Sequence, residues 1–116
     1  MLAIIFYFDI IRNMETQSLT LQADRMAALG NEARLSIIKL LLQALPGELA
    51  AGDIGRRTGI PNSTLSHHLE RLRKEHLVQS RKEKQWIWYR ANTDTLSDLL
   101  NFLYHDCCSG SGVKIN

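Results

Sequence analysis

The 116-residue sequence predicts one mostly helical domain with a single β-hairpin, in the order α-α-α-α-β-β-α. Apolar residues recur at helical spacing along several segments, and glycine or proline separates these segments. One further segment is rich in aromatic residues and has the composition of a strand. The length and the apolar fraction of 45% fit one domain with a modest core.

The first two predicted helices are divided by Gly30. Residues 18–29 are expected to be helical, with Leu21, Met26 and Leu29 loosely on one side. Gly30 ends this helix, and Asn31 is placed to cap the next one. The predicted apolar stripe of the second helix consists of Leu35, Ile38, Leu41, Leu42 and Leu45. Pro46 and Gly47 then end the helix.

A helix-turn-helix is predicted next. Residues 51–58 form a short helix with Ile54 inward, Gly59 breaks it, and Pro61 starts a longer helix that runs to Glu75. The buried face of the longer helix is expected at Leu65, Leu69 and Leu72. Two short helices joined by a tight turn that contains glycine are typical of this motif.

The remaining elements are a hairpin and a last helix. Residues 78–81 and 86–91 predict two strands, with a basic tip at residues 82–85 between them. Thr93 or Asp94 is expected to cap the last helix. Its apolar stripe consists of Leu96, Leu99, Leu100 and Leu103.

Both ends of the chain are predicted to lie outside a domain that spans residues 14–108. Residues 1–11 are apolar but far shorter than the roughly 20 residues that cross a bilayer, and no signal-peptide pattern accompanies them. We interpret residues 1–13 as an extension upstream of a start at Met14; the alternative is an apolar arm that packs on a partner subunit. Residues 109–116 are expected to be a flexible tail. A cytoplasmic protein without membrane contact is predicted.

Positive charge is concentrated in one part of the chain. Residues 53–90 hold nine Lys and Arg residues against four Asp and Glu residues, whereas the remainder carries a net charge of −3. A basic block in a nearly neutral protein is typical of a surface that faces phosphate, and a solvated basic surface is the alternative.

Three motifs carry a resemblance to a known family. They are ALGNEARLSIIKLL (28–41), GDIGRRTGIPNSTLSHHLERLRKEHLV (52–78) and SRKEKQWIWYR (80–90). These segments resemble the ArsR/SmtB family of winged helix-turn-helix repressors, over roughly three quarters of the chain. The resemblance implies a homodimer built on the first and last helices. It also implies binding to double-stranded operator DNA, with release when a metal or metalloid binds.

The polar residues of the fourth helix and of the hairpin are candidates for DNA contact. Short donors and acceptors suited to base edges in the major groove are Asn62, Ser63, Ser66 and His67. Phosphate contacts are predicted for Arg71, Lys74, Arg81, Lys82 and Lys84. For each of them a solvated surface position is the alternative. His68 is either a contact of this kind or a histidine packed at the edge of the core.

Trp86 and Trp88 in the second strand raise a different possibility. We expect one face of the hairpin to pack on the core, which makes base stacking and RNA binding less favoured. An exposed aromatic pair would reopen the question.

Cys107 and Cys108 are the candidate sensing residues. They are the only two cysteines of the chain, so no disulfide framework is possible, and a reducing compartment is indicated. Two adjacent thiolates can chelate a thiophilic metalloid such as arsenite or antimonite. The resemblance places them at the dimer interface, but the third cysteine that some relatives carry is absent, so solvent, a small thiol or the partner chain would complete the site. DNA binding itself is expected to need no cofactor.

Other sensing sites of the family do not match the sequence. The cysteine pair at the start of the third helix is replaced by Ala50-Ala51-Gly52-Asp53. The zinc-type set of Asp and His ligands on the last helix is incomplete, because Asp94 and Asp98 are joined there only by His105.

Two other hypotheses stand beside metalloid sensing. A thiol-redox or persulfide-responsive repressor would use the same two cysteines, although the second helix lacks the cysteine with which family redox sensors pair. A winged-helix protein-interaction module is the third hypothesis. An enzyme is not expected, since no phosphate loop, paired-carboxylate pattern or closed metal motif is present in the sequence.

Overall fold

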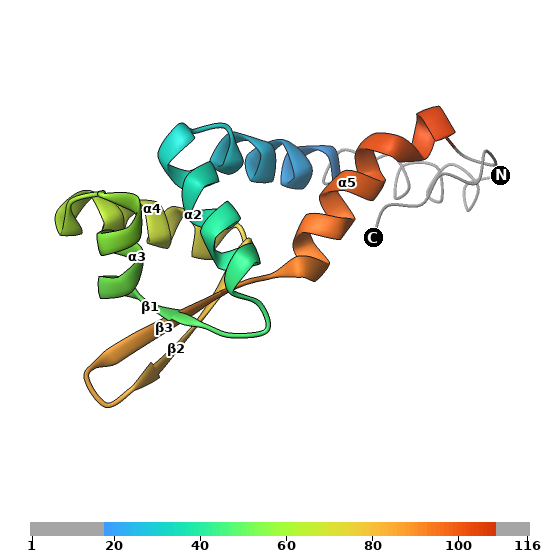
Figure 1. Ribbon diagram of the computed structural model, residues 1–116. Coiled ribbons are helices and arrows are strands. Elements are labelled where there is room, and N and C mark those ends of the chain that lie inside the picture. The colour runs from blue at the N-terminus through green and yellow to red at the C-terminus, as the bar shows by residue number, and fades with distance from the viewer. Residues whose placement is uncertain (1–17, 109–116) are drawn as a thin grey trace, which may run out of the picture.

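The computed structural model describes the backbone of residues 18–108 and the side chains of residues 18–105. The elements are helical residues 18–29, α2 (Glu32–Ala44), β1 (Leu49–Ala50), α3 (Ala51–Thr58), α4 (Asn62–Lys74), β2 (Val78–Glu83), β3 (Trp86–Ala91) and α5 (Thr93–Cys108) (Figure 1). The predicted mostly helical fold with a hairpin is confirmed, and its architecture is that of a winged helix-turn-helix. The predicted extension (1–13) and tail (109–116) lie outside the described residues.

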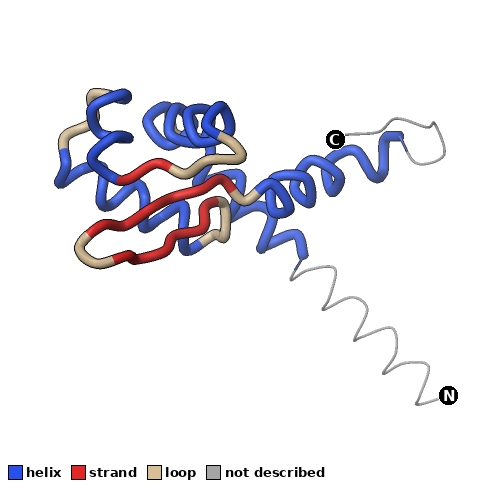
Figure 2. Tube along the Cα trace, turned by 60° about the horizontal axis from the view of Figure 1, so that its bottom comes forward, coloured by secondary structure: helices blue, strands red, loops and turns tan. Residues whose placement is uncertain are grey.

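The three strands form one antiparallel sheet in the order β1-β3-β2. β2 and β3 pair from Val78↔Ala91 to Glu83↔Trp86, which leaves a two-residue turn at the tip. β2 is therefore two residues longer than predicted. The hairpin of β2 and β3 extends away from the helices as a wing (Figure 1), and Figure 2 shows the three strands side by side with β3 in the middle. β1 was not predicted, because a strand of two residues is too short to show a periodic pattern.

The core lies between α2, α3, α4 and the inner face of the sheet. Its fully buried large side chains are Ile37, Leu41, Ile54, Leu69, Leu72, Leu77 and Val78. The predicted buried faces of α3 and α4 are confirmed, since Ile54, Leu65, Leu69 and Leu72 are all within 2% of full burial. The helix-turn-helix is therefore held by the chain's own apolar residues.

The predicted inner face of α2 is partly wrong. Asn31 caps the helix as expected, because its Oδ1 accepts the Arg34 N–H at 3.1 Å. However, Leu35 is 48% exposed, and Ile37 is completely buried in its place. The two positions are about 200° apart around a helix, so they face opposite sides.

Residues 18–29 are helical as predicted, but two of the three apolar residues that were placed loosely on one side of this helix are exposed. Leu21 and Met26 are 41% and 47% exposed, whereas Gln22 and Arg25 are buried. In α5, Leu99 is buried as predicted, but Leu100 and Leu103 are exposed. The cap of α5 is Asn92 rather than Thr93 or Asp94, since its Oδ1 accepts the Thr95 N–H at 3.4 Å.

Candidate nucleic-acid interface

The turn between α3 and α4 fixes the angle at which α4 is presented. Gly59 ends α3 in the left-handed region with a φ of 74°, and its N–H donates to the Gly55 carbonyl at 2.9 Å. Glycine adopts this conformation without steric cost. Pro61 then precedes α4 with an extended backbone, and its carbonyl accepts the Leu65 N–H at 2.8 Å. The two helices are thus joined by only three residues.

One side of α4 is polar and exposed. The structure brings together on this side the four predicted base-contacting residues Asn62, Ser63, Ser66 and His67. The Ser66 hydroxyl donates to the Asn62 carbonyl at 3.0 Å, so its oxygen remains able to accept a further hydrogen bond. An exposed helix side of this kind has the size and chemistry that the major groove admits.

The cations at the end of α4 differ in their partners. Arg73 donates to both carboxylate oxygens of Glu70, at 3.0 and 2.6 Å, and the same contact lowers the pKa of Glu70. Arg71 lies 3.6 Å from Glu75 in a looser pair, and Lys74 is exposed. Arg71 and Lys74 therefore keep the accessibility that a phosphate contact needs.

The wing carries the three predicted basic residues, and they are not equivalent. Lys82 is exposed near the tip, and Lys84 is exposed in the turn with a φ of 56°. Arg81 is instead bound to two carboxylates, those of Glu48 and Glu83. Sequence reasoning missed Glu48, because the residue is 33 positions away from Arg81 along the chain.

The aromatic residues of β3 do not form a fully exposed pair. Trp86 is 53% exposed, but Trp88 is half-buried, and the Arg81 guanidinium carbon lies 5.7 Å from its ring centroid. The expectation that one face of the hairpin packs on the core holds near its base, where Val78 and Ala91 are buried.

His68 is packed at the edge of the core. It is half-buried, and its Nδ1 lies 3.2 Å from Arg34 Nη1 on α2. Burial lowers the pKa of His68, and the positive charge of Arg34 lowers it further. A neutral imidazole with Nδ1 as the acceptor fits this contact. The structure therefore favours a packing role over DNA contact for this residue.

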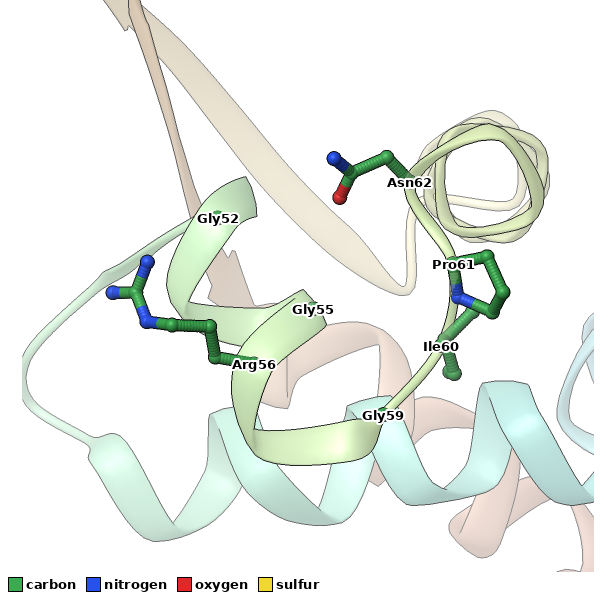
Figure 3. A pocket seen from close by; sticks show the side chains of 7 residues that line it. All are labelled: Gly52, Gly55, Arg56, Gly59, Ile60, Pro61 and Asn62. Atoms are coloured by element: carbon green, nitrogen blue, oxygen red, sulfur yellow. The ribbon is translucent and has the colours of Figure 1, made fainter.

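A shallow groove separates α3 from the start of α4 (Figure 3). Its lining consists of Gly52, Gly55, Arg56, Gly59, Ile60, Pro61 and Asn62. The Asn62 side chain extends across the groove toward α3. A Cβ on Gly55 would lie 3.4 Å from Asn62 Oδ1 and from Leu65 Cδ2, so the glycine permits this close approach. Arg56 is paired with Asp53 on the same helix.

The candidate sensing cysteines occupy the last two positions of α5, and their side chains lie outside the described set. His105 on the same helix is exposed. No group of three or more potential metal ligands occurs among the side chains that the structure describes.

A polar cluster that the sequence did not indicate joins α5 to residues 18–29. Arg25 Nη1 donates to Asp98 Oδ2 at 2.8 Å and to Gln22 Oε1 at 3.1 Å. Gln22 Nε2 donates to the same Asp98 oxygen at 2.9 Å, and these contacts lower the pKa of Asp98. The Arg25 side chain is 10% exposed. This cluster fixes the base of α5 against the first helix.

Comparisons with known proteins agree with this architecture. Residues 31–80 match the model of the bacterial regulatory protein arsR family. The transcriptional activator HlyU of Vibrio cholerae is 33% identical over 86 residues, which cover 74% of this chain and 77% of HlyU. The transcriptional repressor SdpR of Bacillus subtilis is 32% identical over 76 residues, which cover 66% of this chain and 81% of SdpR.

Solved structures show the same fold. The homodimeric winged helix-turn-helix DNA-binding domain of a possible ArsR-family regulator from Mycobacterium bovis has a TM-score of 0.65 and 27% identity, covering 88% of this chain and 93% of that one. Reduced HlyU from Vibrio cholerae has a TM-score of 0.61 and 32% identity, covering 84% and 99% of the two chains.

These relatives are named as transcriptional regulators, as expected for a protein that is not an enzyme. In the described part of the chain, no helix has both the length and the apolar character needed to cross a membrane. The fold, the exposed side of α4 and the sequence matches agree, and the chain belongs to the ArsR family of DNA-binding winged helix-turn-helix transcriptional regulators.

Proposed function

We propose that the protein is a dimeric repressor that places α4 in the major groove of its operator and the wing on the neighbouring backbone. One observation carries the proposal. The polar side of α4 and the basic tip of the wing are exposed, while the opposite side of α4 is fixed in the core by Leu65, Leu69 and Leu72. A rigid helix with an exposed polar side is what base recognition in the major groove requires.

In this arrangement the residues of α4 divide their roles by position. The first turns offer Asn62, Ser63, Ser66 and His67 to base edges, where amide, hydroxyl and imidazole groups can donate and accept hydrogen bonds. Arg71 and Lys74 on the last turns bind phosphate, as do Lys82 and Lys84 on the wing. The phosphate contacts give affinity and salt dependence but little sequence preference.

A second copy of the chain supplies the other half of the DNA-binding surface. Residues 18–29 and α5 expose large apolar side chains at Leu19, Leu21, Met26, Leu100, Leu103 and Tyr104. Such an apolar surface is typical of an oligomer interface, and the Mycobacterium bovis relative is described as homodimeric. A symmetric dimer would present two α4 helices to half-sites one turn of DNA apart.

The signal is proposed to act on Cys107 and Cys108 at the end of α5. Two neighbouring thiolates suit arsenite or antimonite, with a third ligand from a small thiol, solvent or the partner chain. The Arg25–Asp98 contact supports a route by which a change at the end of α5 reaches the DNA-binding helices. It joins α5 to the helix of residues 18–29, and α2 follows that helix in the chain. A coupling free energy of about 1–3 kcal/mol would lower DNA affinity several-fold to a hundredfold.

Oxidation or persulfidation of the same cysteines is the second candidate signal. The observation in its favour is that the structural relative HlyU is described in a reduced form. A vicinal pair can form a strained disulfide, or one thiol can carry an added sulfur.

Titration of a labelled duplex from upstream of the gene tests the proposal by fluorescence anisotropy. With reductant present, we expect salt-sensitive binding that arsenite or antimonite reverses, and no reversal for the variant Cys107→Ser/Cys108→Ser. Release from DNA only by a persulfide donor or an oxidant would show that the inducing signal is redox and not a metalloid. Release of the double serine variant by arsenite would rule out the cysteines, and failure to bind duplex DNA would contradict the proposed function itself.

A further inference from the structure

The two faces of the wing contact different parts of the molecule. Along a strand, side chains alternate between faces, so the pairs Lys82↔Ile87 and Ser80↔Tyr89 share one face. That face is directed toward the core and α4, because Val78 and Ala91 on the same face are buried and β2 packs against α4. Burial raises the pKa of Tyr89 on this face, and the Glu70 carboxylate of α4 raises it further. Lys82 therefore lies on the face of the wing that is directed toward α4.

Arg81 lies on the opposite face. It pairs with Trp88 across the two strands, next to the pair Glu83↔Trp86. Two residues that are neighbours in a strand cannot both point toward the same side of the sheet. Arg81 is thus directed away from the face on which α4 and Lys82 lie.

The contacts of Arg81 span all three strands. On β2, its Nη1 donates to Glu83 Oε2 at 2.7 Å. On β3, its guanidinium group lies over the Trp88 ring at 5.7 Å. Beyond β3, its Nε donates to both oxygens of Glu48, at 2.9 and 3.1 Å, and Glu48 directly precedes β1. Glu48 is followed directly by β1, and β1 is followed without a break by α3, the first helix of the helix-turn-helix. The Arg81–Glu48 contact therefore links the wing to the start of the helix-turn-helix.

The charge around Arg81 also argues against phosphate binding. Two carboxylates share the Arg81 guanidinium group, and a phosphate would have to displace them. Isolated exposed ion pairs contribute little, but a guanidinium group held by several carboxylates and an aromatic ring is better fixed. Arg81 therefore has the contacts of a residue that fixes the wing.

We propose that Arg81 is a positioning residue that sets the angle of the wing relative to the helix-turn-helix, and that it does so through Glu48. This inference rests on the proposed DNA-binding function. Lys82 and Lys84 contact the DNA backbone directly, whereas Arg81 acts indirectly by holding the wing that carries them. Loss of the Arg81–Glu48 contact would let the wing tip move and weaken the contacts that the two lysines make.

Substitution of Glu48 distinguishes a positioning role of Arg81 from phosphate binding, because the two roles predict opposite changes in DNA affinity. If Arg81 positions the wing, Glu48→Gln weakens binding to the labelled duplex by about three- to fivefold, as expected for a fixed surface pair. If Arg81 binds phosphate, Glu48→Gln strengthens binding, because it releases the cation and removes a repelling carboxylate. Repeating Glu48→Gln in the Arg81→Gln background measures the general effect of the lost charge, and the double-mutant cycle subtracts it.

The salt dependence of binding supplies a second readout. Lys82→Gln serves as the matched control and should reduce the slope of log affinity against log salt by about 0.9 for each of the two phosphate contacts that the dimer loses. In the Lys82→Gln/Lys84→Gln background, Arg81→Gln should leave the slope unchanged, because a positioning residue acts through lysine contacts that are already absent. A further reduction of the slope in that background, or a Glu48→Gln variant that binds more tightly after the cycle correction, would overturn the proposal while leaving DNA binding intact.

A measurement without DNA keeps the inference independent of the proposed function. In a Trp86→Phe background, Trp88 is the only tryptophan of the chain. We expect Arg81→Gln and Glu48→Gln each to increase acrylamide quenching of Trp88, because the guanidinium group no longer covers the ring. Quenching that neither substitution changes would show that this contact does not hold the wing, whether or not the protein binds duplex DNA.

Discussion

The helix-turn-helix buries its large apolar side chains, whereas the outer helices bury several polar side chains and leave many large apolar ones exposed. In α3 and α4, Ile54, Leu69 and Leu72 are buried and polar residues are exposed. In residues 18–29 and α5, Gln22 and Arg25 are buried, whereas Leu19 is 59% and Leu103 47% exposed. In the first region, the large apolar side chains pack against other residues of the same chain. The second region exposes apolar side chains, and under the proposed function a second copy of the chain covers them.

Truncation of one leucine in each region gives the largest expected contrast. Leu69→Ala should lower the free energy of unfolding by about 2–5 kcal/mol, because it leaves a cavity in the core. Leu103→Ala should leave the folded monomer intact and weaken self-association, so its effect should depend on protein concentration. Urea denaturation at several concentrations and sedimentation velocity measure the two effects. Equal, concentration-independent losses for both variants would remove the distinction between the regions.

Asp98→Asn tests how the outer helices are held together within one chain. The substitution weakens the charge-assisted contact of a buried guanidinium group, so we expect a loss of about 1–3 kcal/mol in the free energy of unfolding. Asp94→Asn on the first turn of the same helix is the matched control, since Asp94 is exposed and its loss should cost less. Similar losses for the two variants in urea denaturation would show that the Arg25 contact contributes nothing specific.

The contact between α2 and α4 predicts a smaller, pH-dependent effect. The pKa of His68 in the folded protein lies below its usual value of 6.5, chiefly because of burial. The unfolded chain therefore binds a proton more readily than the folded one, and stability should fall as the pH drops below 6.5. His68→Gln should flatten this dependence in urea denaturation between pH 7 and 5. His67→Gln, at the exposed neighbouring position, should preserve it, and a wild-type profile without this slope would contradict the assignment.

Much of the region that contains α3 and α4 is predictable from local signals. Gly59 and Pro61 bound the turn, and Leu65, Leu69 and Leu72 recur at helical spacing, so the helix-turn-helix and its exposed polar side follow from the order of residues. The predicted base-contacting residues share one side of α4 for the same reason. These features depend on contacts within one or two turns of chain.

Errors occur where distant segments decide which side of an element is inside. Ile37 is buried instead of Leu35 because α2 packs against α3, α4 and β3 together, and no local pattern specifies that contact. Arg25 is buried because Asp98, 73 positions later, accepts its hydrogen bond. An apolar stripe predicts the buried side of a helix correctly only when all its apolar residues pack into the core of the same chain.

The order of the helices, the helix-turn-helix, the basic hairpin and the family could all be predicted from the amino-acid sequence, because each depends on local spacing and residue type. The contacts of Arg81 with Glu48 and Trp88, and the position of Lys82 on the side of α4, became known only from the folded structure. Strand pairing and sheet order set these neighbours. Both bring together residues that are far apart in the chain.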